Sequence, residues 1–272
     1  MEIFKNFLSQ IILTVGVIVV FGLLIALCRR LFCLVVGRSA PKILLATGIV
    51  GTPIHELSHA LMCLIFGHKI VEMKLYQPDS DDGTLGYVQH SYNTKNLYHQ
   101  IGNFFIGIAP IVCGSGVLLL LMYLLIPDTC SDVMMELRYI DVSYGLLDPS
   151  TYGAYLSVFW EFISAIFSPD NLGDIRWWIY IVLAIMISGH MELSPADIKG
   201  SAVGLVFLST LLLVVDAILY LISLTALESV TAAMASFSVS IVSFLAISVV
   251  FSLLSLVIAL AVKGILRLVI RR

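Results

Sequence analysis

The chain has 272 residues, of which 60% are hydrophobic and only 12% are charged. A soluble globular domain carries about 25% charged residues, so this chain has too little charge to cover a surface in water. The formal net charge of −3 also provides no basic face for nucleic acid. Composition therefore excludes a soluble enzyme, a disordered tail and a nucleic-acid binder, and it predicts an all-α polytopic membrane protein.

Six runs with little charge are candidates for crossing the bilayer, because about 20 apolar residues span a hydrocarbon core of roughly 30 Å. Lipid offers the backbone no hydrogen-bond partner, so each run is expected to be a helix. The fourth run is short and ends in polar residues. The predicted spans are residues 9–28, 43–66, 101–126, 177–193, 202–224 and 239–262.

The chain divides into three predicted parts. Residues 1–42 are read as a transmembrane anchor with a basic connector, since Arg29 and Arg30 follow the first run where a signal peptide would have a cleavage site. Residues 43–200 form a membrane core that includes an acidic loop over 127–175, and residues 201–272 form a two-helix segment. The basic tail of that segment predicts a cytoplasmic C-terminus by the positive-inside rule, in a multi-pass protein of the cell membrane. The tail residues are Lys263, Arg267, Arg271 and Arg272.

An HExxH motif lies in the second predicted span, formed by His55, Glu56 and His59. Residues i and i+4 share one face of a helix, so both imidazoles can bind one zinc ion. Glu56 lies beside them, where it can take a proton from water on the metal. Ionisable groups inside a membrane are costly and indicate function. The competing interpretation is a hydrogen-bonded polar cluster that packs two helices.

The motif in its apolar helix, followed by Ala60 and then by Gly67, His68 and Lys69, resembles the site-2 protease family of intramembrane zinc metalloproteases. The resemblance covers roughly residues 43–200. It implies Zn²⁺ as the cofactor, a membrane-protein or peptide substrate within the lipid bilayer, and short β-strands after the motif helix. It also implies an aspartate as the third zinc ligand, from a helix two spans later.

A third ligand is needed because a catalytic zinc normally has three protein ligands. The second and fourth spans run parallel, so their C-terminal ends lie on one side of the membrane. The family's aspartate follows prolines and directly precedes glycine, whereas Ile198 and Lys199 separate Asp197 from Gly200 here. The resemblance nevertheless favours Asp197 as the metal ligand. Ser194 and Asp197 also form a helix-start signature, which is compatible with that role.

Other polar residues in predicted spans leave alternatives open. His190 could be the third ligand, or could hydrogen-bond a ligand instead. Asp216 in the fifth span could be the ligand, a hydrogen-bond acceptor for a ligating histidine, or a contact between helices. Asn103 in the third span could bind a substrate peptide or pack two helices. Glu192 could pair with Lys199.

A β-hairpin is expected after the motif helix. Residues 70–76 alternate apolar and polar side chains, residues 78–83 are typical of a turn, and residues 84–90 can return as a second strand. An edge strand could hold an extended substrate by β-addition, or the hairpin could be a plain connection. Residues 152–167 are read as an amphipathic or re-entrant segment, which could be an interfacial helix or a lid over the site.

The five cysteines contain no CxxC pair, so they are interpreted as small packing residues rather than as disulfides or zinc ligands. The three histidines outside the predicted spans, His68, His90 and His99, receive no role. The leading hypothesis is a zinc-dependent intramembrane or juxtamembrane endopeptidase with catalytic Glu56. The alternatives are a non-catalytic membrane protein that binds or transports metal, and a pseudoprotease scaffold.

Overall fold

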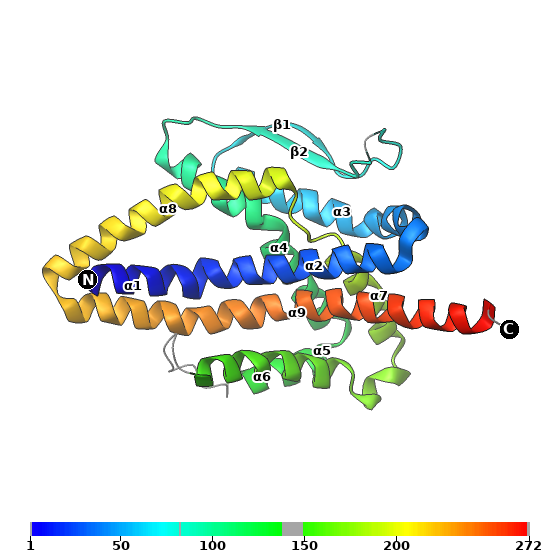
Figure 1. The fold of residues 1–272 in the computed structure, drawn as a ribbon. Helices are drawn as coiled ribbons and strands as arrows, with labels where there is room; N and C mark the ends of the chain where they lie inside the picture. Colours follow the sequence, from blue (N-terminus) through cyan, green and yellow to red (C-terminus); the bar gives the residue numbers. More distant parts are fainter. Residues whose placement is uncertain (1, 82, 138–148, 271–272) are drawn as a thin grey trace.

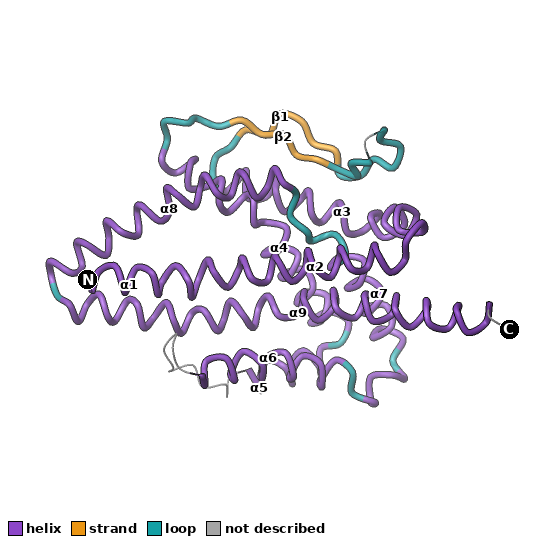
Figure 2. The backbone as a smooth tube through the Cα atoms, in the orientation of Figure 1, coloured by secondary structure: helices purple, strands orange, loops and turns teal. Residues whose placement is uncertain are grey.

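The computed structural model describes residues 2–81, 83–137 and 149–270. Helices dominate the described chain, as predicted, and one two-stranded sheet accompanies them (Figure 2). In chain order the elements are α1 (Glu2–Ile11), η1 (Ile12–Gly16), α2 (Val17–Val36), η2 (Gly37–Ser39), α3 (Ala40–Ile65), β1 (Lys69–Lys74), β2 (Tyr87–Ser91), α4 (Leu97–Leu125), α5 (Pro127–Leu137), α6 (Pro149–Ile166), η3 (Pro169–Gly173), α7 (Ile175–Ser188), α8 (Pro195–Ile222) and α9 (Leu224–Ile270).

Four helical stretches in the described chain are long and apolar enough to cross a membrane. They are Glu2–Ile65, Leu97–Leu125, Pro195–Ile222 and Leu224–Leu268. The first contains two of the predicted spans, and the chain turns back between α2 and α3 (Figure 1), where Gly37 has a φ of 58° that favours glycine.

The fourth predicted span forms only α7, with 14 residues, which rises about 21 Å and is shorter than the hydrocarbon core. The long apolar helices indicate a membrane protein, while six crossings and a cytoplasmic C-terminus remain predictions. Residues 271 and 272 of the basic tail lie outside the described residues.

The described part of segment 127–175 is largely helical. Helix α6 coincides with the amphipathic segment predicted over 152–167, whereas α5 and η3 correct the prediction of a loop. Pro127 and Pro149 begin α5 and α6, a position that suits proline because its missing N–H would have no helical partner. One face of α6 is fully buried in the core through Val158, Phe162 and Ile166. Figure 1 shows α6 on the opposite side of α9 from the hairpin, so α6 does not cover the hairpin side as a lid. Residues 138–148 of this segment lie outside the described residues.

The hairpin is confirmed. β1 and β2 pair antiparallel, from Lys69 opposite Ser91 to Lys74 opposite Tyr87, with a bulge between Ile70 and Glu72. The second strand begins later than predicted, at Tyr87. The hairpin contacts α3, and Figure 1 shows it at one side of the helical layers.

Helices α4 and α8 pack so closely that their backbones are in contact at two glycines. A Cβ atom added to Gly204 would lie 2.1 Å from the backbone nitrogen of Phe104, and one added to Gly107 would lie 2.4 Å from the carbonyl oxygen of Asp197. Small residues allow such close packing of helices in membranes. The contact therefore fixes the first turn of α8 against the middle of α4.

Candidate metal centre

The two motif histidines face each other on α3. The Nε2 atoms of His55 and His59 are 3.1 Å apart, and the ring centroids are 4.9 Å apart. This is the arrangement that the i and i+4 spacing predicts. Both residues are largely buried, with 14% and 8% of their side chains exposed.

The other ring nitrogen of each histidine is held by a backbone carbonyl. The Nδ1 of His55 lies 2.7 Å from the carbonyl oxygen of His190, and the Nδ1 of His59 lies 2.8 Å from that of Ile106. A carbonyl oxygen only accepts, so each Nδ1 carries the proton and donates it. Each Nε2 then keeps its lone pair, and this is the outer hydrogen bond typical of metal-binding histidines.

Asp197 lies beside these nitrogens. Its Oδ1 is 3.3 Å from the Nε2 of His59, and its Oδ2 is 3.9 Å from the Nε2 of His55. The ligand atoms of the three residues all lie within 4.8 Å of one another, so the group could hold one metal ion. The structure therefore brings together the three residues predicted as metal ligands.

The start of α8 positions the Asp197 carboxylate. Its Oδ2 accepts from the backbone N–H of Ser194 at 2.8 Å, and the Ser194 hydroxyl accepts from the backbone N–H of Asp197 at 3.2 Å. This is the capping box expected from the helix-start signature. Asp197 thus lies in the first turn of α8, after the α7–α8 connection, rather than at the end of a long fourth span.

His190 lies next to the cluster but its ring has other partners. The Nε2 is 2.9 Å from the Thr47 hydroxyl and the Nδ1 is 3.4 Å from the Thr52 hydroxyl. Its backbone carbonyl is the group that holds His55. The side chain therefore supports the wall of the site, and its carbonyl orients a histidine of the cluster.

Asp216 and Asn103 lie elsewhere. Asp216 is fully buried and accepts from the Nε2 of Gln10 at 3.2 Å, and it lies about 28 Å along α8 from Asp197, at 1.5 Å per residue. It joins helices, which was one of its predicted roles. Asn103 is buried and its nearest side-chain partner is Gln100, at 3.5 Å.

A cleft of about 360 Å³ opens beside the three residues. Glu56 lines it and is 6% exposed, together with His55 and residues of the α7–α8 connection. Gly86, directly before β2, closes one side: a Cβ atom there would lie 2.8 Å from the Cγ of Glu56. The hairpin backbone therefore passes directly over the glutamate of the motif.

Arg29 of α2 also lines the cleft, and sequence reasoning missed it. Its Nη1 donates to the carbonyl of Gly189, and its Nε lies 3.9 Å from Glu192. Glu192 therefore contacts Arg29, which corrects the predicted pair with Lys199. The available signal was an arginine placed directly after an apolar run, where it was interpreted as part of the basic connector of a membrane anchor.

Comparison with known proteins agrees with this site. The family model DUF3267, whose description reads "Putative zincin peptidase", matches residues 48–159. The match covers the HExxH motif, the hairpin and α4, but stops before Asp197, and it spans less than half of the chain. Searches of curated proteins and of solved structures found no match. The chain is thus similar to a family of zinc metallopeptidases, without a specific likeness to site-2 proteases.

Proposed function

We propose that this protein is a zinc-dependent endopeptidase that cleaves membrane-associated proteins within or next to the bilayer. The observation that carries the proposal is the convergence of His55, His59 and Asp197, with both Nδ1 protons bound by backbone carbonyls. Two imidazoles and a carboxylate are a donor set typical of catalytic zinc. The matched family description supports the same class of enzyme.

The residues around the cluster suit peptide hydrolysis. A zinc ion held by this donor set supplies Lewis-acid chemistry, polarising a peptide carbonyl and lowering the pKa of water. Glu56 lines the cleft next to His55, so its carboxylate would accept a proton from the attacking water and pass it to the leaving amine. Arg29, whose guanidinium also lines the cleft, would donate to a backbone carbonyl of the bound peptide.

The hairpin suggests how a substrate is held. A peptide must be extended for its carbonyl to be reached, and an unpaired strand edge binds extended peptides through backbone hydrogen bonds. The sheet has two strands in the described chain, and Gly86 at the start of β2 lies against Glu56. An added strand along this hairpin would therefore run past the proposed catalytic group.

The proposal also includes the place of cleavage and the orientation of the protein in the membrane. A motif helix, a hairpin and an aspartate from a later helix occur in the order found in site-2 proteases, which favours cleavage inside the membrane. The basic residues Lys263 and Arg267 of α9 favour a cytoplasmic C-terminus in the cell membrane.

The test uses the full chain in lipid vesicles with a library of single-span membrane reporters. The wild type is expected to bind zinc and cleave reporters, whereas Glu56→Gln should bind zinc and lose cleavage. His55→Ala should lose both, and Glu136→Gln, an exposed change on α5, should retain both. A Glu56→Gln protein with full cleavage and bound zinc would refute the proposal and favour metal transport or a scaffold role.

A further inference from the structure

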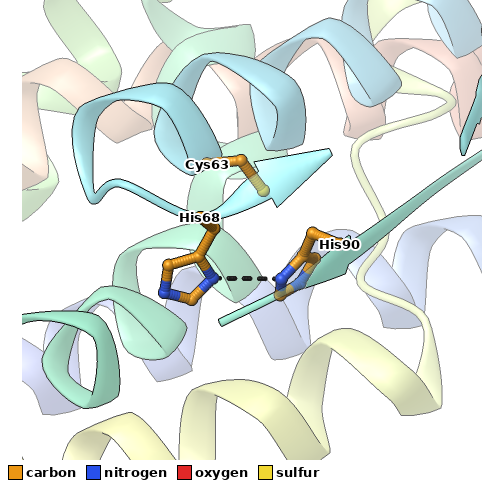
Figure 3. Close-up of side chains that lie close together, drawn as sticks. All are labelled: Cys63, His68 and His90. Atoms are coloured by element: carbon orange, nitrogen blue, oxygen red, sulfur yellow. Dashed lines mark hydrogen bonds between the residues drawn. The ribbon is translucent and has the colours of Figure 1, made fainter. Parts of the chain in front are cut away.

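A second group of metal-binding side chains lies at the end of the motif helix. Cys63 follows His59 by one turn on α3, and the helix ends two residues later. Gly67, with a φ of 70°, then turns the chain so that His68 precedes β1, while His90 comes from β2. Figure 3 shows the three side chains together. Their ligand atoms all lie within 4.8 Å of one another.

The protonation pattern of this group resembles that of the first. The Nε2 of His68 lies 2.9 Å from the carbonyl oxygen of His99, so it carries the proton and donates it. The Nδ1 of His68 therefore keeps a lone pair, and it lies 3.0 Å from the Nδ1 of His90 (Figure 3). Burial is the main cause that lowers the pKa of both histidines, which favours neutral imidazoles.

The separations suit a tetrahedral ion. Zinc bonds of 2.0–2.1 Å to nitrogen and 2.3 Å to sulfur place two nitrogens roughly 3.3 Å apart, and nitrogen and sulfur roughly 3.6 Å apart. The 3.0 Å between the two Nδ1 atoms is close to the first value. The Sγ of Cys63 lies within 4.8 Å of both histidines, and side-chain rotation would bring it to bonding distance.

The surroundings restrict these side chains. Cys63 is fully buried and His68 is 3% exposed. The ring of Tyr92 stacks on His68 with centroids 4.7 Å apart. His90 is partly buried. One thiol and two imidazoles are soft and borderline donors, which favour zinc over magnesium or calcium.

We propose that Cys63 Sγ, His68 Nδ1 and His90 Nδ1 bind a second divalent ion of the zinc class. Binding would displace the thiol proton of Cys63 to solvent, and the resulting thiolate is the metal ligand. The ion would join the end of α3 to both strands of the hairpin. Its role would be structural, because it would hold the strand that Gly86 leads into.

Cobalt provides a test that separates the two sites. Thiolate ligands give Co²⁺ an intense charge-transfer band that nitrogen and oxygen ligands do not, and the cluster of His55, His59 and Asp197 contains no cysteine. The full chain in detergent, stripped by a chelator and titrated with Co²⁺, is expected to bind two ions and to show this band. The double variant His55→Ala, His59→Ala should bind one ion and keep the band.

Variants of the second site should give the reverse result. Cys63→Ser and, independently, His90→Ala are expected to bind one ion and to lose most of the band. Cys130→Ser is the matched control, because Cys130 is also a buried free cysteine. Circular dichroism checks that each variant is folded. A folded wild type without the band, or a folded Cys63→Ser protein that retains it, would overturn the proposal.

Discussion

Replacing Gly107 by alanine is expected to weaken metal binding without touching a metal ligand. The new Cβ atom would lie 2.4 Å from the carbonyl oxygen of Asp197 and 2.0 Å from the hydroxyl oxygen of Ser201. The Ser201 side chain can rotate away, but the carbonyl belongs to the backbone of α8. Relief of the clash therefore requires movement of the first turn of α8, which carries the Asp197 carboxylate.

The size of the effect follows from these distances. An ordinary contact between a Cβ atom and its neighbour begins at 3.4 Å, so α4 and α8 must separate by about 1 Å at this point. Overpacking of this kind typically costs about 1–3 kcal/mol of stability, against a gain of up to about 1 kcal/mol in helix propensity. A mutation that disturbs the groups holding a metal-binding side chain in place typically reduces metal affinity by about 10–100-fold. We expect a loss of zinc affinity in this range.

The assay is zinc competition with a chelator, combined with thermal unfolding of the full chain in detergent. Gly116→Ala on the same helix is the matched control, because its Cβ atom would meet only the Phe244 ring, at 3.5 Å. It should retain wild-type zinc affinity. If Gly107→Ala also binds zinc as tightly as the wild type, then either α8 does not move or Asp197 does not bind the metal, and the reasoning fails.

Three further predictions address other parts of the structure. Gly86→Ala should reduce reporter cleavage while zinc affinity stays within about twofold, since its Cβ atom would press on Glu56; equal cleavage would contradict this. Asp216→Asn should leave zinc affinity, measured by chelator competition, unchanged because this residue lies far along α8; a large loss would make it a ligand. The Arg176 guanidinium holds the pKa of Asp174 below its ordinary value. The stability that this pair contributes is therefore present above a pH of about 4 and is lost as the pH falls through the pKa of Asp174 in the folded state. Asp174→Asn should remove this pH dependence when unfolding is measured against pH.

The local part of the candidate site was predictable from the sequence. The spacing of His55 and His59 defines a shared helix face, and the alternation over residues 70–76 predicts a strand. Asp197 required a longer argument from span parity and the family resemblance. The structure does place Asp197 beside the motif histidines, because the polar connection after α7 returns to α3 and leads into the first turn of α8. Its role as a metal ligand stays a prediction.

The second cluster and the Arg29 contact could not be predicted in the same way. Cys63 lies on the same helix face as His59, but its partners depend on the turn at Gly67 and on strand pairing that brings His90 back to the helix end. Periodicity does not encode such distances. Helix α5 was missed for a related reason, because it is short and packs on α4 and α6 inside the protein rather than forming one long apolar run.

The low charge content of the chain helps to interpret its three largely buried acids, Glu56, Asp197 and Asp216. In a chain with so few charges, each buried acid needs a partner that offsets the cost of leaving water. Asp216 accepts a hydrogen bond from Gln10, and Asp197 lies beside His59 and accepts from the backbone N–H of Ser194. Glu56 borders the cleft instead, where its carboxylate can exchange a proton with water. Under the proposed function, Glu56 would therefore be the acid that exchanges protons, and Asp197 would be the acid that holds the cation.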